Sequence, residues 1–336
     1  MGAERGVAIV EGGVGFGHST FTVLLQDELV RKGITPQVIS PRTDADATTQ
    51  ELWNLAATGY HLAAQNEHVR QLYEQGRNNS DGSRLLSRTR RGLESRIPPN
   101  AVVVSDHAYA SFPSGFFVPP ELKNAQSQFD RESRIGSGQL HVSFLTSGAY
   151  PKAHIDLLRK RILPSLADEM KPQRRKLQLS VYTGTNRDLA LAIVAQSIDL
   201  GISTILNDDD APDGKWGVRV CYSDTAQKAI RTSFTLAEQS DLVITMANER
   251  AGWIGAGVPL ALLMPIGLNA QSNTKYLLDH RLAISPSAML RGDEGLKTLC
   301  VTQGKSLKRM QSRAKGMNLP VNGAENTAQL IYQAVS

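Results

Sequence analysis

The chain opens with an apolar run that ends in glycines. Residues 6–10 (GVAIV) have the pattern of a buried strand, and residues 21–33 (FTVLLQDELVRKG) have the apolar spacing of an amphipathic helix. The stretch between them is rich in glycine, and residues 35–40 (TPQVIS) follow as a second short apolar strand. A strand, a turn, a helix and another apolar strand in this order predict a parallel sheet.

The same pattern begins again in the second half of the chain. A helical region over residues 46–95 and a buried-type strand over 101–108 (AVVVSDHA) precede a stretch rich in Pro, Gly and polar residues, typical of an inter-domain connection. Residues 140–152 (LHVSFLTSGAYPK) then give a strand and a small-residue loop, and helix and strand patterns alternate to residue 265. We therefore predict an α/β fold of two tandem Rossmann-like domains facing a central cleft.

The domain boundary is expected in the polar connection. The prediction assigns residues 1–136 to the first domain and residues 137–336 to the second, with the last helix expected to pack back on the first domain. Ligands of such sheets bind beyond the carboxyl ends of the strands, where both glycine-containing loops are expected to lie.

The first loop does not have the pattern of a cofactor loop. Gly13, Gly15 and Gly17 read GxGxG rather than GxGxxG, and no acidic residue closes the second strand, where NAD-binding proteins hold the ribose. This loop is not followed by GK[ST], so it is not an ATP-binding P-loop. The second loop contains Thr146, Ser147 and Gly148 ahead of a helix and would suit a diphosphate, with a tight turn and helix cap as the alternative.

Polar side chains follow two later strands of the second half, with a small-residue turn at Gly257 between these strands. They could contact sugar hydroxyls and a base or ribose. These residues are Asn248, Glu249, Asn269, Gln271 and Asn273.

The motifs resemble those of GT-B glycosyltransferases, most closely the family of the enzyme that adds N-acetylglucosamine to the lipid-linked peptidoglycan precursor. GGVGFGH resembles that family's N-terminal glycine loop, LTSGA its diphosphate-facing loop, and NGAENTAQLIYQAV its terminal helix. The run DLVIT, then GVP, MP and QSN, resembles the donor-binding half; where the family has its ribose-binding glutamate this chain has Gly252, with Glu249 nearby.

The resemblance implies a transferase that moves a hexosyl or N-acetylhexosaminyl group from a nucleotide-diphosphate sugar, UDP-linked, to an acceptor hydroxyl or amine on the first domain. The donor-binding residues it implies are Gly15, Gly17, Thr146, Ser147, Gly148, Asn248, Glu249, Gly257, Asn269, Gln271 and Asn273. The resemblance implies an inverting reaction, and we expect no essential metal and no cofactor besides this substrate. Helix N-termini and a positive group would stabilise the departing diphosphate.

Inverting transfer requires a base that deprotonates the acceptor. His18, directly after the glycine loop, is the first candidate because imidazole titrates near neutral pH, and a structural or capping histidine is the alternative. Asp106, with His107, ends the strand at 101–108 and is an alternative base, an acceptor contact or a loop residue.

Two other functions share these features. GFGH before a helix also resembles a nucleotide-sugar hydrolase of nonulosonic acid synthesis, which gives the sugar to water and continues GFGHxxR, whereas Phe21 and Thr22 stand near the arginine's place here. A non-catalytic protein that binds nucleotide sugars is the third possibility, and it would not depend on His18.

Charge and composition narrow the partners. The net charge is +5, and much of it lies among seven arginines between Arg70 and Arg96, which could dock an anionic membrane surface or a phosphorylated acceptor, or form a solvated helix face. Tyr73 is the one aromatic residue among these arginines, too few for a base-stacking surface, so we expect no nucleic-acid partner. Two cysteines without a CxxC motif and the lack of a spanning apolar run favour a cytoplasmic protein with possible membrane association.

Overall fold

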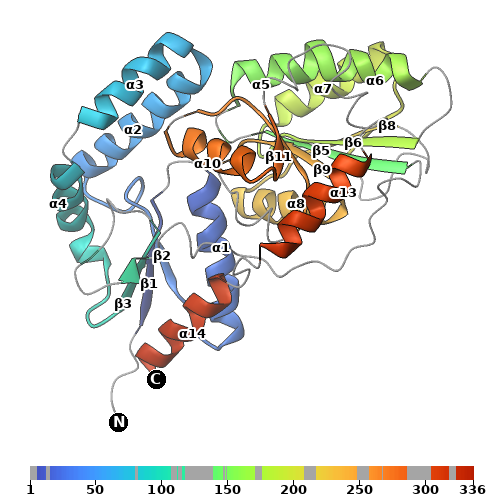
Figure 1. Cartoon of the computed structure of the whole chain (residues 1–336). Helices are drawn as coiled ribbons and strands as arrows, with labels where there is room; N and C mark the ends of the chain where they lie inside the picture. The colour runs from blue at the N-terminus through green and yellow to red at the C-terminus, as the bar shows by residue number, and fades with distance from the viewer. Residues whose placement is uncertain are drawn as a thin grey trace. The chain divides into compact units, whose positions relative to one another are not determined.

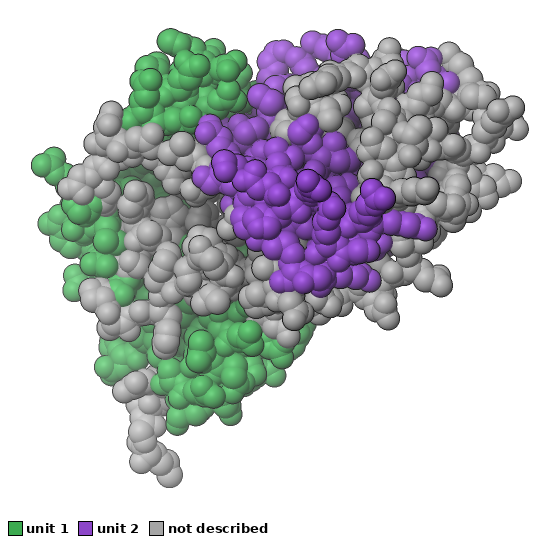
Figure 2. All heavy atoms as spheres, in the orientation of Figure 1, with its two compact units in different colours: residues 1–127, 320–336 green, residues 128–319 purple. Residues whose placement is uncertain are grey.

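The computed structural model describes most of the 336-residue chain, in residues 6–12, 16–79, 82–106, 112, 116–117, 139–146, 148, 150–170, 176–207, 217–247, 257–266, 268–285, 304–317 and 323–336. The chain divides into two compact units: residues 1–127 with 320–336 form unit 1, and residues 128–319 form unit 2 (Figure 2, green and purple). The boundary expected at residues 136–137 falls outside the described residues.

Unit 1 has a parallel sheet of four described strands in the order β2-β1-β3-β4 (Figure 1). The strands are β1 (Val7–Val10), β2 (Gln37–Ile39), β3 (Val102–Ser105) and β4 (Phe116–Phe117). The helices are α1 (Phe16–Arg31), α2 (Ala47–Gln65), α3 (Glu67–Asn79), α4 (Gly82–Leu93), the 3-10 helix η1 (Glu94–Arg96) and α14 (Gly323–Val335).

Both faces of β1 and β3 are buried, which explains why these strands are almost entirely apolar rather than alternating. Val7 and Ile9 of β1 pack in one core cluster with residues of α1 and α14, including Ile331. Ala8 and Val10 face the other way and join a cluster with Trp53 of α2 and Leu93 of α4. The last helix of the chain therefore completes one face of the first unit.

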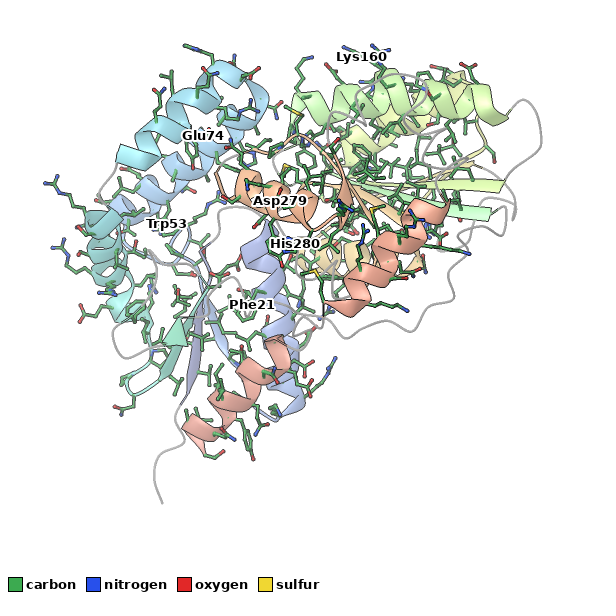
Figure 3. All side chains as sticks on the ribbon, in the orientation of Figure 1. Phe21, Trp53, Glu74, Lys160, Asp279 and His280 are labelled. Atoms are coloured by element: carbon green, nitrogen blue, oxygen red, sulfur yellow. The ribbon has the colours of Figure 1, made fainter. Side chains whose placement is uncertain are left out.

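Trp53 joins two helices on the second face. Its ring is 1% exposed, and its Nε1 donates to the hydroxyl of Thr89 on α4 at 2.9 Å. The same hydroxyl donates to the carbonyl of Leu85 at 2.8 Å. Figure 3 labels Trp53 on α2 and Phe21, which packs in the opposite cluster, on α1. A large apolar ring with a satisfied N–H fixes α2 against α4.

Unit 2 has a parallel sheet of seven described strands in the order β11-β10-β9-β5-β6-β8-β7. The strands are β5 (Gln139–Leu145), β6 (Lys176–Tyr182), β7 (Thr204–Leu206), β8 (Gly217–Cys221), β9 (Leu242–Thr245), β10 (Leu260–Leu262) and β11 (Ala283–Ile284). The helices are α5 (Lys152–Leu157), the π-helix η4 (Leu158–Ile162), α6 (Leu163–Met170), α7 (Arg187–Asp199), α8 (Ala226–Gln239), α10 (Leu268–Asp279) and α13 (Gly304–Gly316). In Figure 1, α5, α6 and α7 lie along one side of this sheet and α8 along the other.

The predicted fold class is confirmed, since each unit is a parallel α/β sheet of the Rossmann type. Three details differ from the sequence prediction. The helical region over 46–95 is three helices with a 3-10 turn, α1 begins at Phe16 rather than residue 21, and the short strands β4, β7 and β11 were not expected. Strands of two or three residues carry too few positions to show a hydrophobic period. The central cleft stays a prediction, because each unit is described by itself.

The described part of the chain contains no helix with the length and hydropathy needed to span a membrane.

A glycine in α4 makes room for the cap of α2. Asp46 accepts hydrogen bonds from the backbone N–H of Thr49 at 3.1 Å, from the Thr49 hydroxyl at 2.8 Å and from Arg88 Nη2 at 2.6 Å. These bonds, with that from the Thr49 hydroxyl the largest, hold the pKa of the Asp46 carboxyl below its usual value. A Cβ atom on Gly92 would overlap the side chains of Asp46 and Thr49. Only glycine therefore fits at this position.

We predict that Gly92→Ala lowers the free energy of unfolding by about 1–3 kcal/mol, because the methyl group would displace the Asp46 cap. Gly76→Ala is the matched control, since Gly76 is a helical glycine of α3 with open space at its Cβ position. That variant should be neutral or more stable by about 0.5–1 kcal/mol. Denaturant unfolding of both variants checks this, and equal stabilities would contradict the packing argument.

Candidate functional site

The strand order of unit 2 defines a place where the chain reverses its direction across the sheet. From β5 the chain goes to β6 on one side, and β9 later returns to the other side of β5. Sheets of this type bind ligands beyond the carboxyl ends of the two strands at the reversal. The carboxyl ends of β5 and β9 are followed by Thr146 and Met246, so the predicted loop with Thr146 and Gly148 lies at this position.

The loop after β5 is anchored to the neighbouring strand end. The backbone N–H of Thr146 donates to the carbonyl of Tyr182 at 3.1 Å, and its hydroxyl donates to the same carbonyl at 2.9 Å. Gly148 lies in a turn, and Tyr150 has a φ of 46°, a left-handed conformation that is strained for a bulky residue. Ser147 lies outside the described residues. The first residue of the loop is thus fixed to the end of β6.

The side chain of Tyr182 connects the end of β6 with the segment after β8. The ring is 3% exposed, and its hydroxyl is 3.3 Å from the hydroxyl of Ser223, which follows β8. Burial raises the pKa of Tyr182 well above its usual value, so the hydroxyl keeps its proton. Tyr182 therefore joins the ends of β5, β6 and β8, and nothing in the sequence pattern had marked it out.

The predicted amides beyond β10 lie on the first turns of α10. Leu263 extends the ladder by donating to the carbonyl of Thr245 at 2.9 Å, and α10 begins at Leu268 on the same edge of the sheet. Gln271 is exposed and Asn273 is half-buried, and helix positions two apart do not face each other. These two amides therefore cannot both contact one ligand group. Asn269 lies in α10, with its side chain outside the description.

Gly257 is not brought together with these residues, which corrects its assignment to the donor site. It precedes β10, and Pro259 accepts from the backbone N–H of Val243 near the start of β9. Gly257 thus lies at the amino edge of the sheet, opposite to the strand ends followed by Thr146. Its φ of 67° and the Lys315 side chain, 3.3 Å from a Cβ placed there, explain the glycine by turn geometry and packing instead.

Asn248 and Glu249 lie outside the described residues, so their predicted contacts stay predictions. They follow β9 directly after the 3-10 residue Ala247, and so belong to the chain segment that leaves the reversal point. The structure describes no three His, Cys, Asp or Glu residues grouped as metal ligands within its assigned ranges.

Three histidines that the sequence prediction assigned to no site are structural or exposed. His141 is buried, with Nδ1 2.8 Å from the carbonyl of Gln239 and Nε2 2.7 Å from the hydroxyl of Ser180. His154 is buried on α5, and its Nε2 lies 2.9 Å from the carbonyl of Met264. His280 is exposed at the end of α10.

Unit 1 has a similar reversal between β1 and β3. Asp106 follows β3, is 2% exposed, and accepts a hydrogen bond at 2.9 Å from the backbone N–H of Gly12, which follows β1. Asp106 thereby holds the beginning of the glycine-rich loop, a role that sequence reasoning did not foresee. The base assignment of Asp106 stays a prediction.

The rest of the glycine-rich loop is described in part. Gly17 and His18 lie in the first turn of α1, which begins at Phe16, and Gly15 lies outside the described residues. The His18 side chain is also outside the description. The backbone of His18 is therefore placed at the helix N-terminus beside the carboxyl edge of the unit 1 sheet.

No family model matches the sequence, and no curated protein matches it. Solved structures are similar over nearly the whole chain. The spinosyn rhamnosyltransferase in complex with spinosyn aglycone has 13% identity and a TM-score of 0.49, over 96% of this chain and 99% of that chain. MurG of Acinetobacter baumannii has 15% identity and a TM-score of 0.44, over 98% and 99%. A putative UDP-N-acetylglucosamine 2-epimerase from Listeria monocytogenes has 10% identity and a TM-score of 0.47, over 99% and 96%.

Glycosyltransferases thus stand among the structures to which the chain is similar. Each of these TM-scores is below 0.5 and each identity below 25%, so the likeness carries no conclusion on activity. The two tandem parallel α/β units are established by the sheets of the chain itself.

We predict that Asp106→Ala lowers the free energy of unfolding by about 1–3 kcal/mol, because the buried N–H of Gly12 loses its acceptor. The amide of Gly12 should also exchange its hydrogen faster. Asp106→Asn keeps an acceptor oxygen and should stay closer to the wild type. If the Ala and Asn variants have the same stability and exchange, the bond does not hold the loop.

Proposed function

We propose that the chain is a glycosyltransferase that moves a sugar from a nucleotide-diphosphate sugar to an acceptor hydroxyl or amine. The observation that supports this most strongly is the position of the predicted diphosphate loop. Thr146 and Gly148 follow the central strand β5 at the reversal point of the unit 2 sheet, where sheets of this type bind nucleotides. The loop is held by two hydrogen bonds to one carbonyl of β6.

The proposal assigns the donor to unit 2 and the acceptor to unit 1. The amides on the first turns of α10 and the segment after β9 would contact the sugar and the nucleoside, and the backbone at Ser147 and Gly148 would contact the diphosphate. Backbone N–H groups are suited to this, because they stabilise the charge that develops on the departing diphosphate. We propose a UDP-linked hexosyl or N-acetylhexosaminyl donor, an inverting reaction and no essential metal, as the motif resemblance implies.

His18 is the proposed base. Its backbone lies in the first turn of α1, directly after the glycine-rich loop, and a neutral imidazole can accept a proton. The imidazole would take the proton from the acceptor while the acceptor oxygen or nitrogen attacks the anomeric carbon and the bond to the diphosphate breaks. Asp106, already bonded to Gly12, would serve by holding the loop that presents His18.

We further propose peripheral contact with an anionic membrane through the segment Arg70–Arg96. Two arginines of this segment already pair with carboxylates. Arg70 pairs with Glu67 at 3.1 Å, and Arg88 pairs with Asp46 at 2.6 Å. Exposed leucines on α2 and α3 add apolar surface, which favours binding to lipid over binding to a soluble polyanion. These are Leu52, Leu55, Leu62 and Leu72, at 41%, 70%, 55% and 56% exposure.

The proposal predicts that the protein binds at least one nucleotide-diphosphate sugar and releases the nucleoside diphosphate only when an acceptor is present. Calorimetry with a panel of nucleotide sugars, followed by product analysis with and without soluble and lipid-linked acceptors, measures both. Release of free sugar without an acceptor would instead identify a hydrolase. Binding without any turnover would identify a binding protein, and no binding at all would end the proposal.

His18→Ala is expected to lower kcat by roughly 100-fold to 10,000-fold, the usual contribution of general-base catalysis, with the affinity for the nucleotide sugar kept. His68→Ala is the matched control, because His68 is an exposed histidine on α3 of the same unit. It should have wild-type kcat. Turnover by a folded His18→Ala protein at the wild-type rate would remove His18 from the mechanism.

A further inference from the structure

One buried histidine connects two of the loops at the proposed donor site. His154 lies in the first turn of α5, six residues after Gly148, and is 2% exposed. Its Nε2 is 2.9 Å from the backbone carbonyl of Met264, which follows β10. Because a carbonyl oxygen can only accept, Nε2 must carry the hydrogen and donate it.

This bond spans a strand. In the sheet order β10-β9-β5, the strand β9 lies between the two strands whose following segments the bond joins. Strands are about 4.8 Å apart, so the ends of β5 and β10 are separated by about 9.6 Å and cannot bond to each other directly. The histidine side chain, reaching from α5, covers this separation at the reversal point itself.

His154 places a hydrogen-bond donor at a position where the neighbouring inward-facing side chains are apolar. The helical segment that carries His154 otherwise turns apolar residues inward, with Leu157, Leu158 and Ile162 all buried. A buried imidazole among leucines is unfavourable unless it is hydrogen-bonded, because it gives up its contacts with water. The bond of its Nε2 to a main-chain atom of another segment offsets part of this cost.

The segment after β10 benefits from an external donor. Leu263 still bonds to β9 through its N–H, whereas Pro265 has no N–H with which to extend the ladder. Met264 lies between these residues, immediately before the turn into α10. Fixing its carbonyl therefore fixes the direction in which α10 begins, and with it the place of Gln271 and Asn273.

We propose that His154 is a positioning residue of the donor site: its Nε2–H holds the carbonyl of Met264 and so fixes the β10–α10 segment relative to the loop after β5. The inference rests on the proposed function for its effect on substrate, and on the structure alone for its effect on the segment. Loss of the Nε2–H weakens binding of the nucleotide sugar. It leaves the chemical step unchanged, because His154 touches neither the sugar nor the acceptor.

The test compares His154→Leu with His154→Gln in the full chain. Leucine fills the volume without a donor, whereas the glutamine amide can place an N–H close to the position of Nε2. We expect His154→Leu to raise KM for the nucleotide sugar about 10-fold with kcat within about 2-fold of wild type, the pattern of lost uniform binding. His154→Gln should recover most of the affinity. The amides of Ile266 and Ala270 should exchange faster in the Leu variant only, in the absence of any ligand.

His141→Gln is the control for general destabilisation, since His141, on β5, is also buried in unit 2 and bonds to Gln239 and Ser180 instead. It should leave KM and the exchange of Ile266 unchanged at a temperature where all variants are folded. An unchanged KM in His154→Leu, equal impairment of the Gln and Leu variants, or an equal effect of His141→Gln would each overturn the inference. If wild-type protein binds no nucleotide sugar, the proposed function fails, and amide exchange alone decides the role of His154.

Discussion

The structure of both units depends on one constraint of parallel sheets. Strands that run the same way need crossover helices, and a central strand with neighbours on both sides requires crossovers on both faces. β1 lies between β2 and β3, and β5 lies between β6 and β9. The chain therefore leaves two adjacent strand ends in opposite directions. This divergence provides room for ligands and also requires the apolar strands whose two faces are both buried.

The same divergence leaves main-chain groups beyond the strand ends without a ladder partner, and buried side chains supply one. Asp106 accepts from Gly12 in unit 1, and His154 donates to Met264 in unit 2. In each case a side chain from one segment holds the backbone of another. These backbone segments are thus held by contacts within their own unit, so the side that would face a ligand needs no covering structure.

The sequence predicted what depends on local pattern. The apolar runs predicted β1, β3 and β5 and the parallel type of both sheets. The assignment of Gly257 to the donor site was wrong, because a sequence motif does not show which end of a strand it adjoins. That depends on the direction of the strand, which the pairing of β9 and β10 settles. His154 carried no signal, because its partner is a backbone carbonyl 110 residues away along the chain.

The return of α14 to the first unit has a consequence for the order in which the protein can form. Ile331 and Ala328 belong to the same core cluster as Val7 and Phe21, so this cluster, to which α1 already contributes, stays incomplete until the C-terminal helix has been made. Unit 2 is encoded entirely between these parts and can close first. At about 5–20 residues per second, roughly 15–60 s separate the synthesis of α1 from that of α14. During vectorial synthesis, the N-terminal unit is therefore the last of the two to be completed.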